Sequence, residues 1–237
     1  LILCSQKFSN IYLKYLFSFI ITLGIALLLS LQPDIGQTLL VFFSWSVLIF
    51  TSGVNIFLLF FLFSSVILIF FYLIFFVSKF TYIKNRLISF LDSETGTYNF
   101  QSDKALESIT SGGFFGKGIG EGTLKNRVPE AHTDYIISVI SEEFGVIAII
   151  LIFLLFLVFI YSVFKKVNFE NDETIKLILV GSISLILMQT IIHIGVNIRL
   201  FPTTGMTLPF ISYGGSSIIS ISILSGIILN FTKRNLN

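Results

Sequence analysis

Long, continuous apolar runs alternate with short polar segments along most of the 237 residues. A membrane-spanning helix needs roughly 20 mostly apolar residues. In hydrocarbon every backbone N–H and C=O group must be satisfied within its own segment, so such runs form helices, whereas a β-barrel would show short alternating segments. The pattern predicts an all-α polytopic membrane protein with about six transmembrane helices, over residues 15–31, 35–52, 54–78, 144–164, 175–197 and 208–231.

Hydropathy collapses between residues 79 and 143, where Gly, Ser, Lys and Glu gather. A connection this long usually has a functional role. We therefore expect about three transmembrane helices in 1–78, one large extracytoplasmic loop with the catalytic motif in 79–143, and three helices in 144–237, the last one kinked and followed by a short cytoplasmic tail. Because Leu1 lies inside an apolar run, we also expect an N-terminal portion to be missing.

Composition strengthens the membrane assignment, since 54% of the residues are hydrophobic and only 12% are charged. A soluble domain of this length needs more charge at its surface. The net charge of +2 and the lack of a basic cluster with interleaved aromatic residues argue against a nucleic-acid partner. Cys4 is the only cysteine, which excludes an intramolecular disulfide and a thiolate metal site.

Lysine and arginine in short loops predict the orientation of the helices. Three basic groups fall on one side if the chain crosses six times, and we assign that side to the cytoplasm: Lys7 and Lys14, Lys165 and Lys166, and Lys233 with Arg234. Lys79, Lys84 and Arg86 then lie outside, in a long loop where this rule is weak. The outer side receives residues 32–36, 79–143 and 197–205, which indicates a site at the outer membrane face.

The densest polar stretch runs from Val128 through Asp134 to Glu142. At helical spacing Asp134, Ser138, Ser141 and Glu142 share one face, so this helix enters the bilayer with a polar stripe facing inward. Asp134 could simply cap the helix, where a carboxylate meets the positive end of the dipole. The neighbouring acidic residues and His132 favour a functional role, because such groups are costly to bury in a membrane protein. A partly desolvated carboxylate at a water–lipid boundary could act as a general base.

Residues 111–125 form a glycine-rich segment that matches neither a P-loop nor a dinucleotide-binding fingerprint. It could be no more than a flexible loop. Its glycine-freed amides, with Lys117 and Lys125, would also suit an anionic headgroup or a diphosphate.

A third cluster covers residues 197–217, where Pro209 and the pair Gly214–Gly215 interrupt an apolar run. This predicts a broken helix that faces protein or a cavity. The hydroxyls of nearby serines would satisfy the freed backbone groups. His193, on the preceding helix, is more consistent with an interior histidine than with a proton-handling group.

Three motifs in this order resemble those of the SEDS family of bacteria (FtsW, RodA and SpoVE): Gln-Pro-Asp-Ile-Gly at 32–36, Pro-Glu-Ala-His-Thr-Asp at 129–134 with Glu-Glu-Phe-Gly at 142–145, and Leu-Pro-Phe-Ile-Ser-Tyr-Gly-Gly-Ser-Ser at 208–217. The similarity extends over essentially the whole chain. Gly-Glu-Gly-Thr-Leu-Lys at 120–125 is closest to the division-type members, FtsW. Tyr135, where Phe is usual, and residues 136–138 depart from the pattern without removing a functional group.

The resemblance implies a ten-helix fold, of which this chain would hold about the last six helices, and a peptidoglycan glycosyltransferase in the bacterial cytoplasmic (inner) membrane, at the division septum. Such an enzyme joins lipid II units with inversion to β-1,4 glycan strands. Implied partners are lipid II, a class B penicillin-binding protein and other divisome proteins. The family's essential aspartate corresponds to Asp134. The candidate substrate contacts are Lys117, Lys125, Glu130, His132, Glu142, Arg199 and Ser216, and the structural motif residues are Pro33, Asp34, Gly36, Gly205, Pro209, Gly214 and Gly215.

Two other functions compete with catalysis. A lipid II flippase would need ionisable residues in the middle of the membrane, and the predicted helices contain few. A non-catalytic division scaffold would not need the acidic stripe from Asp134 to Glu142. Asp134, Glu130 and His132 could hold a divalent cation, but no ligand spacing requires a metal.

Overall fold

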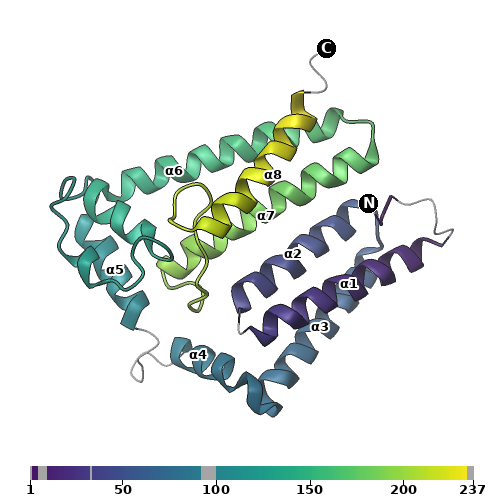
Figure 1. Ribbon diagram of the computed structural model, residues 1–237, viewed down its shortest axis with the longest axis horizontal. Coiled ribbons are helices and arrows are strands. Elements are labelled where there is room, and N and C mark those ends of the chain that lie inside the picture. Colours follow the sequence, from purple (N-terminus) through teal and green to yellow (C-terminus); the bar gives the residue numbers. More distant parts are fainter. Residues whose placement is uncertain (1, 5–9, 33, 92–99, 234–237) are drawn as a thin grey trace. The chain divides into compact units, whose positions relative to one another are not determined.

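The computed structural model describes residues 2–4, 10–32, 34–91 and 100–233. Within these ranges the chain is helical and contains no strand, which confirms the all-α prediction. Five helices are long and apolar enough to cross a membrane: α1 (Ile11–Leu31), α3 (Ile56–Phe76), α6 (Ile136–Phe169), α7 (Glu173–Asn197) and α8 (Gly215–Lys233). The shorter apolar helix α2 (Ile35–Thr51) accounts for the sixth predicted segment. Figure 1 shows these helices in sequence colours.

The chain divides into two compact units. The first comprises the described parts of residues 1–84, 162–188 and 224–237, and the second residues 85–161 and 189–223. Helices α6, α7 and α8 each contribute residues to both units.

In the first unit α1 and α2 pack against each other. Asn10 caps α1, its Oδ1 accepting a hydrogen bond from the Tyr12 N–H at 3.0 Å. Asp34 caps α2 in the same way, accepting from the Gln37 N–H at 3.0 Å. Trp45 is buried against α1, and its indole N–H donates to Ser18 Oγ at 3.2 Å. Motif residue Asp34 therefore starts α2, where Gly36 is buried; Pro33, Lys7 and Arg234 lie outside the described residues.

Large apolar side chains cover the outside of α3. Phe57, Phe60 and Phe76 are each more than 70% exposed to the surroundings of the chain. A helix that is apolar on its outer face suits lipid and not water. Gly53, with φ +83°, makes the tight turn that joins α2 to α3.

The described residues between 79 and 143 include two helices that hydropathy does not signal, α4 (Thr81–Leu91) and α5 (Phe100–Gly112). Short 3₁₀ turns are η1 (Ser78–Phe80) and η2 (Leu124–Arg127). The chain then leads into α6, which begins at Ile136 and is interrupted at Gly145 (φ 79°, ψ 178°). The predicted helix over 144–164 corresponds to the part of α6 after this break. At the other end of the chain, residues 202–214 are not helical, and α8 begins only at Gly215.

Candidate functional site

The turn before α6, which carries Asp134, is held through its own backbone in the second unit. Three consecutive carbonyl oxygens accept hydrogen bonds: that of His132 from the Tyr213 N–H at 3.0 Å, that of Thr133 from Ser212 Oγ at 2.7 Å, and that of Asp134 from Asn197 Nδ2 at 3.0 Å. The donors come from α7 and from the non-helical segment before α8. The main chain at Asp134 is thus fixed by contacts that do not use its carboxylate.

Hydrogen bonds to the Glu130 carbonyl oxygen stabilise this turn. Glu130 adopts φ 54°, and its carbonyl oxygen accepts from the N–H groups of Thr133, Asp134 and Tyr135 at 3.1–3.3 Å. The Thr133 hydroxyl also donates to Glu130 Oε2 at 3.0 Å. A positive φ at a non-glycine residue costs free energy and persists where surrounding contacts impose it.

The Asp134 side chain is half-buried, and Gly205 lies directly beside it. A Cβ atom added at Gly205 would lie 3.5 Å from Asp134 Oδ2, so a larger side chain at this position would press on the carboxylate. Gly205 has φ +71°, which glycine adopts without strain. The motif glycine therefore leaves room next to the carboxylate.

Tyr135, the residue after Asp134, is affected by the charges of both Asp134 and Arg86. Tyr135 is 2% exposed, and burial raises the pKa of its hydroxyl; the Asp134 carboxylate raises this pKa further, while Arg86 lowers it. Arg86, on α4, donates from Nη1 to the Thr203 carbonyl oxygen at 2.8 Å. From the sequence Arg86 could be noted only as a basic residue in the long loop, because no local pattern relates it to Thr203, which is 117 positions away.

A cavity of about 710 Å³ lies next to the turn, within the same unit. Its wall contains five polar residues, Glu130, His132, Thr133, Glu143 and Tyr213, together with the apolar residues Val128, Ala131 and Val139. Two of the predicted substrate contacts, Glu130 and His132, therefore line one cavity. Within the described ranges no three His, Cys, Asp or Glu side chains converge closely enough to hold a metal ion, and this includes the set Asp134, Glu130 and His132.

Polar side chains at i, i+4 and i+8 of α7 bind the segment before α8. Gln189 Nε2 donates to the Thr207 carbonyl oxygen at 2.9 Å, and His193 Nδ1 lies 2.7 Å from the Met206 carbonyl oxygen. Asn197 Nδ2 donates to the Asp134 and His193 carbonyl oxygens. His193 is buried, as an interior histidine is expected to be. This α7 ladder (Gln189, His193 and Asn197) therefore contacts both the non-helical segment 202–214 and the Asp134 turn.

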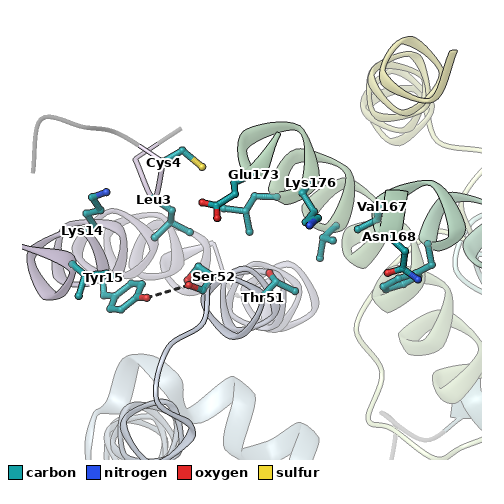
Figure 2. A pocket seen from close by; sticks show the side chains of 14 residues that line it. Leu3, Cys4, Lys14, Tyr15, Thr51, Ser52, Val167, Asn168, Glu173 and Lys176 are labelled. Atoms are coloured by element: carbon teal, nitrogen blue, oxygen red, sulfur yellow. Dashed lines mark hydrogen bonds between the residues drawn. The ribbon is translucent and has the colours of Figure 1, made fainter. Parts of the chain in front are cut away.

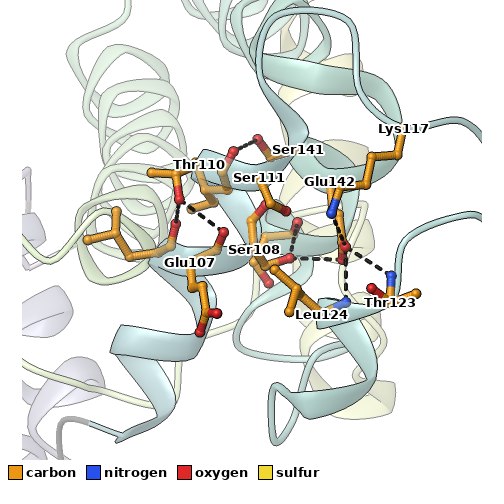
Figure 3. Close-up of polar contacts among 12 residues, drawn as sticks. Glu107, Ser108, Thr110, Ser111, Lys117, Thr123, Leu124, Ser141 and Glu142 are labelled. Carbon is orange, nitrogen blue, oxygen red and sulfur yellow. Dashed lines mark hydrogen bonds and ion pairs between the residues drawn. The ribbon is translucent and has the colours of Figure 1, made fainter.

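Glu142 is fully buried. Figure 3 shows its contacts with Lys117, Thr123 and Leu124 of the glycine-rich segment. Its Oε1 accepts from the Thr123 and Leu124 N–H groups at 2.9 and 3.0 Å and forms a 3.2 Å ion pair with Lys117 Nζ. Its Oε2 accepts from Ser108 Oγ at 3.1 Å. The polar stripe predicted to face inward is buried at Ser138, Ser141 and Glu142, and it faces α5. Substrate binding by Glu142 stays a prediction, and the geometry assigns its carboxylate to protein donors.

The amides of the glycine-rich segment also bind α6. The Lys117 and Gly118 N–H groups donate to the Glu142 and Glu143 carbonyl oxygens at 2.8 and 3.0 Å, and the Val146 N–H donates back to the Gly113 carbonyl oxygen at 3.0 Å. These bonds cross the break at Gly145, where an added Cβ would lie 2.1 Å from the Phe114 carbonyl oxygen. The glycines thus allow close backbone packing at the break, and these amides already have acceptors within the protein.

Of the remaining predicted contacts, Lys117, Arg199 and Ser216 are not among the residues that line the cavity beside the Asp134 turn. Lys125 lies in η2, and its side chain is outside the described part of the structure. Lys117 keeps 35% of its side chain exposed beside Glu142. Arg199, with φ 58°, pairs with Asp103 of α5. Ser216 is exposed in the first turn of α8, just after the motif residues Pro209, Gly214 and Gly215.

Fold and site together define a polytopic helical membrane protein in which a long polar segment between spans carries a fixed acidic turn beside a cavity. Comparison with known families identifies the class. The chain belongs to the cell cycle protein family of FtsW, RodA and SpoVE, whose model matches residues 4–237, and this confirms the SEDS resemblance.

Similar proteins agree with this family assignment. The chain is 36% identical over 212 residues to a probable peptidoglycan glycosyltransferase FtsW of Caulobacter vibrioides, covering 90% of this chain and 53% of that protein. It is 38% identical over 146 residues to a protein of the same description in Enterococcus hirae, covering 61% and 36%. The chain spans about half the length of the curated relatives it matches.

Two solved structures share the fold. One is described as "Structural coordination of polymerization and crosslinking by a peptidoglycan synthase complex", with a TM-score of 0.77 and 26% identity over 94% of this chain and 63% of the other. A crystal structure of a variant of the rod shape determining protein RodA of Thermus thermophilus has a TM-score of 0.60 at 24% identity, covering 94% of this chain and 58% of the other. The second likeness concerns the fold alone.

Proposed function

We propose that this chain carries the catalytic site of a peptidoglycan glycosyltransferase that polymerises lipid II at the outer face of the bacterial cytoplasmic membrane. The observation that carries the proposal is the turn at Asp134, whose three consecutive carbonyls are bound by residues 197, 212 and 213 next to a cavity of about 710 Å³. Asp134 is not among the residues that line the cavity, but His132 and Thr133 of the same turn are. A carboxylate on this fixed turn, next to a cavity that can admit a sugar, suits general base catalysis.

In this mechanism Asp134 takes the proton of the acceptor's 4-hydroxyl group. The oxygen attacks the anomeric carbon of the donor sugar from the face opposite the leaving group. A new C–O bond forms as the bond to undecaprenyl diphosphate breaks, and the diphosphate leaves with the electron pair. The product is an inverted, β-1,4-linked glycan. Negative charge develops on the departing diphosphate, and cations would stabilise it. The candidates are Lys117 and Lys125 of the glycine-rich segment, with Arg199 as a weaker one.

The relatives are named peptidoglycan glycosyltransferases FtsW, and a structural neighbour is described as a peptidoglycan synthase complex. The description of the family as a cell cycle protein supports a role in cell division, and the crosslinking named for the structural neighbour supports a crosslinking partner. Within the proposal the location is the division septum and the partner is a class B penicillin-binding protein. Within the proposal, Glu130 and His132 contact the sugar or peptide from the cavity wall, and Ser216 contacts substrate at the start of α8.

The test is polymerisation of labelled lipid II by the purified protein in liposomes, with its transpeptidase partner present. Asp134→Asn should lower the rate by about 10²–10⁴-fold, the usual contribution of a general base, while lipid II binding stays nearly unchanged. Asp172→Asn is the matched control, because Asp172 caps the start of α7 through Oδ1 and asparagine caps equally well.

Three results would contradict the proposal in different ways. Glycan strands made by Asp134→Asn at the wild-type rate would remove Asp134 from the chemistry. Movement of lipid II across the bilayer without strand formation would indicate a flippase. Recruitment of division proteins with neither activity would indicate a scaffold.

A further inference from the structure

A second polar cavity, of about 410 Å³, lies in the first unit at one end of its helices. Helices α1 and α7 begin there, α2 ends there, and the last turns of α6 contribute to its wall. Figure 2 shows Lys14, Glu173 and Lys176 among the side chains that line it. None of the residues of this cavity belongs to the Asp134 site or to the motifs described above.

The cationic groups of this cavity come from two separate helices. Lys14 is the fourth residue of α1 and Lys176 the fourth of α7, and both are half-buried. Within the described part of the chain neither ammonium group forms an ion pair. The Glu173 carboxylate also lies at the cavity, so the lining has a formal charge of +1 when all three groups are ionised. A cavity with this charge complements one monoanionic group.

Neutral donors extend the polar wall. The Tyr15 hydroxyl is 3.5 Å from the Ser52 carbonyl oxygen, a weak hydrogen bond that a better acceptor could replace. Apolar side chains such as Leu177 and Val180 line the rest of the cavity. A wall that is cationic and hydroxylated on one part and apolar on another matches a headgroup joined to acyl chains.

The position of the cavity relative to the membrane points to the same ligand. Lys14 and Lys176 stand in the first turns of two helices that are long and apolar enough to span a bilayer. Lysines at such positions extend their ammonium groups to the level of lipid headgroups. Lys165 and Lys166 lie at the same helix ends, on the side that loop charges predict to be cytoplasmic.

We propose that this cavity binds the phosphodiester headgroup of a phospholipid from the adjacent leaflet. Lys14, Lys176 and the Tyr15 hydroxyl donate to the phosphate oxygens, and Glu173 accepts from a hydroxyl or ammonium group further along the headgroup. Phosphatidylglycerol and phosphatidylethanolamine have such a donor, whereas phosphatidylcholine has none. The single negative charge of phosphatidylglycerol complements the lining best. The site is independent of the proposed glycosyltransferase activity.

The test measures which lipids the purified protein retains after detergent washing, from a supply of equal parts phosphatidylglycerol, phosphatidylethanolamine and phosphatidylcholine. The wild-type protein should retain phosphatidylglycerol over phosphatidylcholine by about tenfold, and the double variant Lys14→Ala/Lys176→Ala should lose most of this preference. The matched control is Lys165→Ala/Lys166→Ala, which removes the same charge at the same helix ends outside the cavity lining. Size-exclusion profiles verify that both variants fold.

Each alternative outcome overturns the proposal. An equal loss of preference in both double variants would show general attraction of the basic helix ends to anionic lipid. Equal retention of phosphatidylcholine would exclude recognition of the headgroup. If millimolar inorganic phosphate displaced the lipid, a soluble phosphate compound would be the ligand. Should Lys14→Ala/Lys176→Ala fail to fold, Glu173→Lys serves instead, because it should strengthen phosphate binding and abolish any preference for ethanolamine over choline.

Discussion

Replacement of Glu142 by alanine should be among the most destabilising single changes in the second unit. The Glu142 carboxylate is fully buried and accepts from the Thr123 and Leu124 N–H groups, from Lys117 and from Ser108. Alanine leaves these donors without their acceptor and opens space between α5, α6 and η2. Hydrogen bonds to a charged group contribute about 1.5–3 kcal/mol each, and breaking a buried ion pair costs about 3–5 kcal/mol.

Loss of the ion pair with Lys117 costs less than this buried-pair value, because 35% of the Lys117 side chain is exposed and water can hydrate its ammonium group. The two backbone N–H groups dominate the remainder, so we expect Glu142→Ala to lower the free energy of unfolding by about 3–5 kcal/mol. Glu142→Gln keeps an oxygen at the position of Oε1 and can still donate to Ser108, so its cost should be about 1–2 kcal/mol.

Thermal unfolding in detergent, followed by the loss of monodisperse protein on size exclusion, measures this difference. For a chain of this size about 1 kcal/mol shifts the midpoint by roughly 2–4 °C, so Glu142→Ala should unfold roughly 6–20 °C below the wild type. Glu107→Ala is the control, since Glu107 forms only a surface ion pair with Lys104 and its loss should not shift the midpoint measurably. Equal midpoints for the two alanine variants would refute the view that Glu142 holds the glycine-rich segment.

Three further changes test other parts of the second unit. Gly145→Ala should cost roughly 2–4 kcal/mol by thermal unfolding, because it combines a positive φ with a backbone clash, whereas Gly226→Ala, with open space around it, should be neutral or slightly stabilising. Asn197→Ala should lower kcat for lipid II polymerisation more than it raises KM, because Asn197 holds the backbone of Asp134; a change confined to KM would contradict this positioning role. Tyr135 has a raised pKa in the folded protein, so stability should fall as the pH rises above about 10, where the unfolded chain ionises first, and Tyr135→Phe should remove that decline.

Hydropathy sufficed to predict the apolar helices, because a membrane span is specified by local composition and length. It missed α4 and α5, which have 11 and 13 residues and mixed polarity, since neither is long or apolar enough to stand out. The family could be recognised because three short motifs keep their order and spacing. The inward-facing stripe at Ser138, Ser141 and Glu142 followed from helical periodicity, and all three are buried.

The contacts that organise the site could not be predicted from the sequence, because they join distant segments. The Asp134 carbonyl and Asn197 are 63 positions apart, and the Thr133 carbonyl and Ser212 are 79 apart. The glycine-rich segment suggested free amides for an anion, but its partner is α6, and only the fold brings the two together. Local sequence patterns indicate which polar groups are costly to bury, but their hydrogen-bond partners depend on tertiary packing.

The two acidic residues that stood out in the sequence are held in opposite ways, and this separates stability from chemistry. Glu142 uses its carboxylate to bind backbone donors, so the fold depends on the charged group itself. At Asp134 the backbone carbonyls carry the contacts to α7 and to residues 212 and 213, and those contacts remain when the side chain changes. Because asparagine keeps the shape of the aspartate side chain and leaves these backbone contacts in place, Asp134→Asn should fold with a thermal midpoint close to that of the wild type, whereas Glu142→Ala should be clearly destabilised. If Asp134→Asn proved as unstable as Glu142→Ala, its carboxylate would be a structural group, and lost polymerisation in that variant would no longer indicate a general base.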